Sequence, residues 1–418
     1  MTATVVTAGP PGRLQALRYG LCVGCISCGG PAGQIGILHR ELVEERRWLP
    51  GEEFERALNL CMLLPGPEAL QLVIYRGWRW YGAVGGIVAG LCFLLPAALL
   101  LTGLSLGYLL YGRLAPVVAV IAGLQCVVVA LVAQAVQRLA QRALGGWRQR
   151  LIALAAFAAL ALLQAPFLLV IVASGAAGAL VLTPRPVAAV VAAPVAWQRT
   201  ALCLGLGLGC WLLAWLLVAG ERFGTRPPPL YLHFSKVALG GFGGAYAVLA
   251  YVNQELAGTL GWLGSGDLLA GVALAETTPG PLVLVLQFYG FVSGWHSQGP
   301  LSPAAAALLC SALASWAMFL PSFVLVIALA PYVERLRSNA LLAAALEAVS
   351  AAVVAVLAVF ALQVARKVLL PEGLWLPDWR ATGLALGSWL VLTRTRLDLP
   401  WVLAGGAGLS LAVRLLAS

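Results

Sequence analysis

Charged side chains are scarce in this sequence. Only 10% of the 418 residues are Asp, Glu, Lys or Arg, whereas 61% are hydrophobic, and the mean hydropathy is +0.93. Soluble domains contain about 25% charged residues, and a soluble fold of this length needs far more polar surface than this chain supplies. The composition therefore excludes a soluble globular protein and predicts a chain whose apolar surface is covered by membrane lipid.

Several long segments contain no charged residue at all. These segments are 80–112, 114–137, 151–184, 200–220 and 277–333. A membrane-spanning helix needs roughly 20 mostly apolar residues, and each segment is a continuous run of Leu, Ala, Val and Gly rather than the short alternating pattern of outer-membrane strands. The sequence predicts an all-α polytopic membrane protein, because helices satisfy their own backbone hydrogen bonds in lipid.

Residues that bind metals or carry out catalysis are also few. The three histidines have no metal-ligand spacing, and Cys22, Cys25 and Cys28 lack a fourth ligand, so we interpret them as packing residues. No nucleotide-binding or metal motif is present. We predict no cofactor, no metal and no enzymatic activity. An enzyme acting on lipid or polyprenyl phosphate would need an acid/base or metal constellation that the sequence lacks.

Positive charge exceeds negative charge, with 26 Lys and Arg against 16 Asp and Glu, a net charge of +10. In a membrane protein this excess indicates cytoplasmic loops and contacts with anionic lipid rather than nucleic acid. Only Lys236 and Lys367 are lysines. The arginines that make up the rest keep their charge when desolvated and bind oxyanions with a planar fork.

The chain contains an internal repeat. A shift of 214 positions aligns residues 28–75 with 242–289 without a gap, and it superimposes Gly-Gly, Glu, Trp-Leu and Pro-Gly-Pro elements. An insertion of about eleven residues in the second copy then brings Phe93–Pro96 onto Phe319–Pro321. Repeats of this kind are typical of secondary transporters.

The repeat predicts four parts of the chain. They are a first repeat at 1–138, connecting spans at 139–230, a second repeat at 231–365 and C-terminal spans at 366–418. Three apolar segments in the connector place the second repeat upside-down relative to the first. We therefore predict two inverted-topology repeats with broken helices and about thirteen spans in total.

Glycines and prolines interrupt the apolar runs at matching positions, at 29–31, 65–67, 243–244 and 279–281. Proline ends one helix and is favoured as the first residue of the next. The positive end of a helix that starts inside the membrane attracts anions. The alternative is that these residues only kink their helices; four breaks in one register favour an anion site instead.

Polar residues near the breaks complete the predicted site. The predicted substrate-binding residues are Gly29, Gly30, Pro31, Gln34, Pro65, Gly66, Pro67, Gln71, Arg76, Lys236, Gly243, Gly244, Pro279, Gly280 and Pro281. The candidates for proton coupling are Glu68, Glu276 and Glu347, because burial favours the neutral form of a carboxyl group. For Arg76 and Lys236 the alternative is that they extend to the membrane interface; for Glu68 it is a helix cap.

The motifs around the breaks resemble those of the chromate ion transporter family. The first half contains CGGPAGQIGILHRELVEERRWL from Cys28 and LPGPEALQL from Leu64; the second contains GGFGGA and ETTPGPL. These strings are similar to the family's F-G-G-P…E…W-L and P-G-P-E-A signatures. The sequence departs from them at Cys28, where the family has phenylalanine, whereas the second copy keeps Phe242.

The resemblance implies a two-domain carrier of the bacterial inner membrane that exports chromate, confers chromate resistance and draws on the proton gradient or membrane potential. Sulfate has a similar charge and shape and is the natural competitor. The alternatives are a carrier for sulfate or another oxyanion, and an anion channel. Membrane lipid is the other expected partner, nucleic acid is not, and a homodimer stays open.

Overall fold

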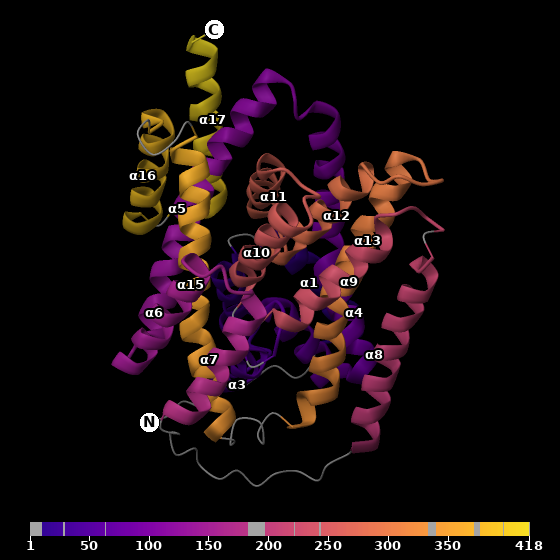
Figure 1. Cartoon of the computed structure of the whole chain (residues 1–418). Coiled ribbons are helices and arrows are strands. Elements are labelled where there is room, and N and C mark those ends of the chain that lie inside the picture. Colours follow the sequence, from indigo (N-terminus) through magenta and orange to yellow (C-terminus); the bar gives the residue numbers. More distant parts are fainter. Residues whose placement is uncertain are drawn as a thin grey trace. The chain divides into compact units, whose positions relative to one another are not determined.

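The structure is a computed structural model of the whole chain, and every regular element in its described residues is a helix (Figure 1). The described residues are 11–27, 30–62, 64–182, 197–220, 222–241, 244–332, 340–371, 377–395 and 397–417. Six helices are long and apolar enough to cross a membrane: Glu68–Tyr111, Ala115–Ala143, Trp197–Val218, Pro303–Tyr332, Ala340–Leu369 and Leu399–Leu416. The predicted all-helical, polytopic architecture is confirmed.

The first half of the chain folds into helices α1 to α7. They are α1 (Arg13–Ile26), α2 (Gly30–His39), the π-helix η1 (Arg40–Glu45), α3 (Gly51–Cys61), α4 (Glu68–Tyr111), α5 (Ala115–Ala143), α6 (Trp147–Ala161) and α7 (Phe167–Val181). Helix α8 (Trp197–Val218) follows.

The second half contains helices α9 to α17. They are α9 (Pro227–Gly240), α10 (Ala245–Gln254), the π-helix η2 (Glu255–Thr259), α11 (Ser265–Thr277), the 3-10 helix η3 (Leu282–Leu284), α12 (Val285–Trp295), α13 (Pro303–Leu329), the 3-10 helix η4 (Ala330–Tyr332), α15 (Ala340–Leu369), α16 (Trp379–Arg394) and α17 (Leu399–Ala417).

The chain divides into two compact units. Unit 1 comprises Met1–Gly103, Val190–Ala245 and Thr278–Leu336, and unit 2 comprises the remainder. In unit 1, α13 packs against α8, α9 and α12. Small residues allow α12 and α13 to approach closely, since a side chain at Gly290 or Gly294 would meet the backbone of α13.

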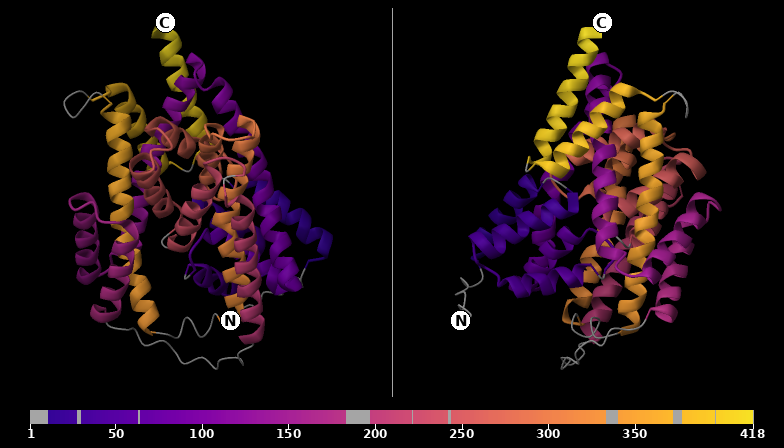
Figure 2. Two further views of the ribbon diagram at one scale, coloured as in Figure 1. Left: turned by 45° about the vertical axis from the view of Figure 1, so that its right-hand side comes forward. Right: turned by 90° about the vertical axis from the view of Figure 1, so that its left-hand side faces the viewer.

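Unit 2 is built around α5 and α15, which pack against each other. Helices α6 and α7 lie along α15, whereas α16 and α17 lie along α5 (Figure 2). Two glycines permit the close contacts: Gly123 faces the backbone of α17, and Gly178 faces the backbone of α15. The small residues that interrupt these apolar runs therefore serve helix packing here.

The two halves share backbone features at positions 214 apart. Helices α1 and α9 are each 14 residues long and begin at Arg13 and Pro227. A π-helix follows the second helix in both halves. The backbone N–H of Trp48 bonds to the carbonyl of Leu42 at 2.9 Å, and the N–H of Trp262 bonds to the carbonyl of Leu256 at 3.0 Å. The two halves therefore share helix starts, a π-helix and a local hydrogen bond at matching positions.

The eleven-residue insertion lies where the sequence comparison put it. Helix α4 has non-helical backbone angles at Tyr81 and Gly82, and it carries Pro96 in its interior. In the second half this kink is replaced by a complete break between α12 and α13, and α13 carries Pro321 in its interior. One kinked helix in the first half thus corresponds to two helices in the second.

Arg47 has a left-handed backbone, with φ +52°, at the position that matches Gly261, with φ +57°. This conformation costs a non-glycine residue on the order of 1–3 kcal/mol. We expect Arg47→Gly to raise the free energy of unfolding of the purified protein and Gly261→Ala to lower it, by about 1 kcal/mol each, and the unfolding temperature to shift in the same direction. Thermal unfolding in detergent tests the pair; an unchanged midpoint in both variants would contradict this expectation.

Candidate polar centre at the broken helices

Both Pro-Gly-Pro turns lie in unit 1, and each is hydrogen-bonded to a residue that directly follows the first helix of the other half. The backbone N–H of Gly280 donates to the carbonyl of Ser27 at 2.8 Å, and that of Gly66 donates to the carbonyl of Gly241 at 3.3 Å. Ser27 directly follows α1, and Gly241 directly follows α9. Ser27 and Gly241 are 214 positions apart, and so are Gly66 and Gly280. Each half therefore supplies the hydrogen-bond acceptor that the broken helix of the other half needs.

The packing around the two glycines is crossed in the same way. A Cβ atom added to Gly66 would overlap the Ser322 hydroxyl of α13, and one added to Gly280 would overlap the Ala97 methyl group of α4. Ala97 and Ser322 each follow the interior proline of their helix. Both glycines also have positive φ angles, +123° and +102°. Only glycine satisfies both requirements at these positions.

Two glutamine side chains hold the turns in place. The Gln34 amide nitrogen donates to the carbonyls of Gly280 and Ser27, and the Gln71 amide nitrogen donates to the carbonyl of Pro65 at 2.7 Å. Gln34 is 2% exposed and Gln71 is fully buried. These amides satisfy carbonyl groups that the proline breaks leave outside a helical ladder.

Buried oxygen atoms gather beside the turns without a hydrogen-bond partner in the described part of the chain. They are the Ser27 hydroxyl, the Ser322 hydroxyl and the Gln71 amide oxygen. All three side chains are 0% exposed. Buried polar atoms are normally paired with protein or solvent, so this cluster is suited to receive a polar ligand. We call Ser27, Gln34, Gly66, Gln71, Gly280 and Ser322 the polar centre.

The comparison with known proteins agrees with this architecture. The profile of the family described as chromate transporter matches residues 14–179 and 229–411, which cover α1 to α7 and α9 to α17. The chain belongs to the chromate transporter family. The resemblance stated from the sequence is confirmed, and this transporter carries one family match on either side of α8.

Curated relatives resemble the transporter over most of its length. A "Probable chromate transport protein" of Synechococcus elongatus is 31% identical over 327 residues, 78% of this chain and 77% of the relative. A "Chromate transport protein" of Pseudomonas aeruginosa is 31% identical over 356 residues, which are 84% of this chain and 81% of the relative. A "Chromate transport protein" of Cupriavidus metallidurans is 27% identical over 348 residues, which are 81% of this chain and 79% of the relative. No solved structure matches the chain.

The other predicted site residues of the transporter are distributed as follows. Gly30 and Gly244 have positive φ angles at the entrances to α2 and α10. Gly29 and Gly243 lie outside the described residues. Lys236 is exposed on α9. Pro31, Pro65, Pro67, Pro279 and Pro281 flank the turns and helix starts described above.

Within the part of the chain that the structure describes, Arg76 makes no hydrogen bond or ion pair with the Pro-Gly-Pro turns. It lies further along α4, where its Nη1 donates to Glu53 Oε1 at 2.9 Å. Its guanidinium group lies 4.7 Å from the centre of the Trp80 ring. Arg76 and Trp80 line a separate pocket.

The three candidate carboxylates of the transporter lie in different environments. Glu276 near the end of α11 is 3% exposed, and the Tyr246 hydroxyl donates to its Oε1 at 2.8 Å. Glu347 in α15 is half-buried and accepts a hydrogen bond of 2.8 Å from the Gln149 amide. Glu68 is half-buried at the first position of α4. Glu276 is therefore the most buried of the three.

Sequence reasoning missed three polar residues of these sites: Ser27, Ser322 and Tyr246. Ser322 had a signal, because it directly follows Pro321, which the repeat pairs with Pro96. Ser27 directly precedes a Cys-Gly-Gly segment. Tyr246 had no signal, since its contact with Glu276 depends on how α10 packs against α11.

The crossed packing predicts a specific rescue. Gly280→Ala should destabilise the transporter by about 1–3 kcal/mol, because the added Cβ overlaps Ala97. Adding Ala97→Gly should recover part of this loss; the remainder comes from the positive φ angle. Thermal unfolding of the single and double variants measures the coupling. Gly103→Ala, with open space in the same helix, is the control, and an additive double variant would contradict the prediction.

Proposed function

We propose that this protein is a secondary active transporter that exports chromate, with the polar centre as its substrate site. The single observation that carries this proposal is the crossed pair of hydrogen bonds from Gly66 and Gly280. They bring the broken helices of both halves together around buried, unpartnered oxygen atoms. Discontinuous helices that meet in this way are the usual substrate sites of secondary transporters.

The chemistry of the polar centre suits a tetrahedral dianion. Helix α4 starts after Pro67, and its first N–H groups have no acceptor within the helix. Ala69 and Leu70 of this turn are buried, so their N–H groups and the helix dipole act in an environment with little water. The hydroxyls of Ser27 and Ser322 add donors. Neutral donors of this kind bind an oxyanion without fixing it permanently in a charge pair.

The topology in this proposal is that of two inverted repeats. The two halves cross the membrane in opposite directions, with about thirteen spans in all, including short and broken helices. Residues 1–138 and 231–365 are the proposed repeats, joined by 139–230 and followed by 366–418. The relatives from Pseudomonas and Cupriavidus are named "Chromate transport protein", which supports chromate as the substrate; the proposal further places the protein in a bacterial inner membrane, where export would contribute to chromate resistance.

Energy coupling is assigned to Glu276 in this proposal. Its carboxyl group is buried and accepts a hydrogen bond from the neutral Tyr246 hydroxyl. The chain joins it to Pro279 within three residues. A proton on this carboxyl group removes a buried negative charge. Protonation and substrate occupancy can therefore influence each other through the turn that follows α11.

Proteoliposome flux tests the substrate site. With purified protein, an imposed pH gradient or voltage should drive chromate uphill, and sulfate should compete. Downhill flux alone would favour an anion channel. We expect Ser322→Ala to lower chromate flux about tenfold, because a hydrogen bond to an ion is lost. Ser350→Ala, whose hydroxyl bonds to its own helix, is the matched control; equal flux in both variants would contradict the proposed site.

A second variant tests the coupling. Glu276→Gln keeps the hydrogen-bond acceptor for Tyr246 but cannot carry a proton. We expect it to lose accumulation driven by a pH gradient while it retains exchange of labelled chromate across vesicles with equal concentrations. Glu347→Gln serves as the control with a half-buried carboxylate. If Glu276→Gln accumulates chromate like the unmodified protein, the coupling carboxylate lies elsewhere.

A further inference from the structure

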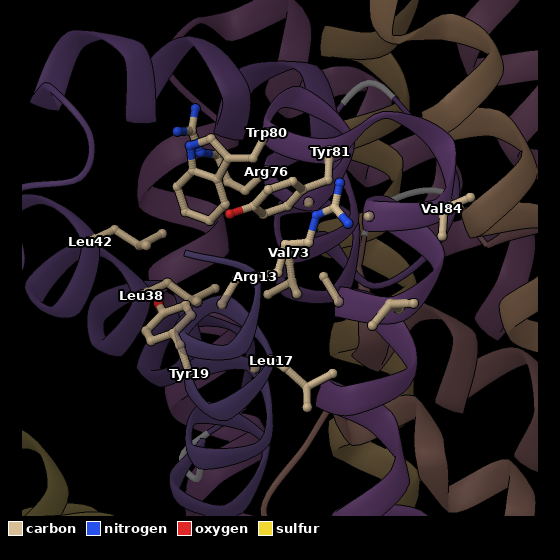
Figure 3. A pocket seen from close by; sticks show the side chains of 16 residues that line it. Arg13, Leu17, Tyr19, Leu38, Leu42, Val73, Arg76, Trp80, Tyr81 and Val84 are labelled. Carbon is tan, nitrogen blue, oxygen red and sulfur yellow. The ribbon is translucent and has the colours of Figure 1, made fainter. Parts of the chain in front are cut away.

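Unit 1 contains a pocket with a largely apolar wall that shares no lining residue with the Pro-Gly-Pro turns. It is a pocket of about 570 Å³ between α1, α2, η1 and the first part of α4 (Figure 3). Its lining residues with long side chains include Arg13, Leu17, Tyr19, Arg76, Trp80 and Tyr81. Among the residues that the structure describes, no aspartate or glutamate lines this pocket, and Glu53 reaches Arg76 from outside the lining.

Arg76 is held rigidly at this pocket. The residue is 4% exposed, its Nη1 bonds to Glu53 at 2.9 Å, and its guanidinium group stacks at 4.7 Å on the Trp80 ring. Its Nε atom is buried and has no hydrogen-bond partner in the described residues. The ion pair with Glu53 therefore fixes the guanidinium group, and its buried Nε–H is left without an acceptor in the described residues.

Tyr19 presents a second unused donor to the same pocket. It is 7% exposed, and its hydroxyl is buried without a partner among the residues described. The Arg46 guanidinium group lies 5.2 Å from its ring centre, and the Trp48 ring contacts it edge-on, also at 5.2 Å. Arg46 itself pairs with Glu41 at 2.8 Å. These neighbours hold the tyrosine ring in position.

Two buried, unpartnered donors in one pocket indicate a missing acceptor, because unpaired buried donors cost free energy. We propose that this pocket binds a tetrahedral oxyanion, with Arg76 Nε–H and the Tyr19 hydroxyl donating to its oxygens. Arg13, at the start of α1, adds positive charge from the exposed side. A guanidinium N–H beside a hydroxyl is a strong combination for an anionic oxygen.

The oxyanion can come from two sources. A free dianion such as sulfate or chromate fits the donors, and so does the phosphate group of an anionic lipid. The exposed Leu17, Val84 and Val88 line the same hollow, and they would contact an acyl chain. This binding is an equilibrium property, so it does not rest on the proposed transport cycle.

Two conservative substitutions isolate the donors. Tyr19→Phe removes only the hydroxyl, and Arg76→Lys keeps a cation for Glu53 but lacks the Nε–H group. Tyr111→Phe at the exposed end of α4 is the matched control. In lipid-free detergent, sulfate should change the tryptophan fluorescence of the unmodified protein and of Tyr111→Phe, because Trp80 stacks on Arg76. We expect Tyr19→Phe and Arg76→Lys to bind sulfate about tenfold more weakly than the unmodified protein.

The second arm distinguishes the lipid source. The same proteins are reconstituted in phosphatidylcholine with and without phosphatidylglycerol, extracted gently, and the retained phosphatidylglycerol is measured by mass spectrometry. Loss of sulfate binding in Tyr19→Phe assigns the pocket to a free anion; loss of retained phosphatidylglycerol alone assigns it to a lipid phosphate. If Tyr19→Phe and Arg76→Lys fold normally and bind both ligands like Tyr111→Phe, or if none of the proteins binds either, the proposal is overturned.

Discussion

A backbone N–H group that loses its helical acceptor inside a membrane must find another partner, and this requirement organises unit 1. The Pro-Gly-Pro turns break two helices in apolar surroundings, where no bulk water can pair the freed groups. The N–H groups of Gly66 and Gly280 each donate a hydrogen bond to a backbone carbonyl of the other half. Neither half completes its own break. The two sequence repeats are therefore structurally interdependent, and this explains why the turns and their acceptors occur in one register.

The repeated backbone carries side chains that differ between the halves. Ser322 corresponds to Ala97, and both occupy the space beside the glycine of the opposite turn. Gln34, which binds the carbonyl of Gly280, corresponds to Val248, and Glu276 corresponds to Met62. The backbone is thus similar in the two copies at these positions, whereas Gln34 occurs only in the first copy, and Ser322 and Glu276 occur only in the second. In the proposed function, these groups, which differ between the copies, bind the substrate and carry the proton.

Much of the architecture was accessible from the sequence, because composition, charge-free runs and the 214-residue register report directly on lipid exposure and helix breaks. The crossed pairing was not, since periodicity within one half says nothing about which half supplies an acceptor. The π-helices had no hydrophobic pattern of their own. Ser27 and Ser322 look like ordinary small residues in apolar helices until the packing of α13 against the first turn is known. The environment of Arg76 likewise depends on how α1 packs against α4.

The scarcity of charged side chains in this protein is consistent with the release of a bound anion. An ion that must leave its site cannot be held by a bare cation in a low-dielectric interior, where opposite charges attract strongly. The polar centre contains amides, hydroxyls and helix ends but no charged side chain. The buried Arg76 is partly neutralised by Glu53 and lies in another pocket. We infer that the protein places its arginine where an anion is collected or a lipid is held, and its neutral dipoles where the anion must be released.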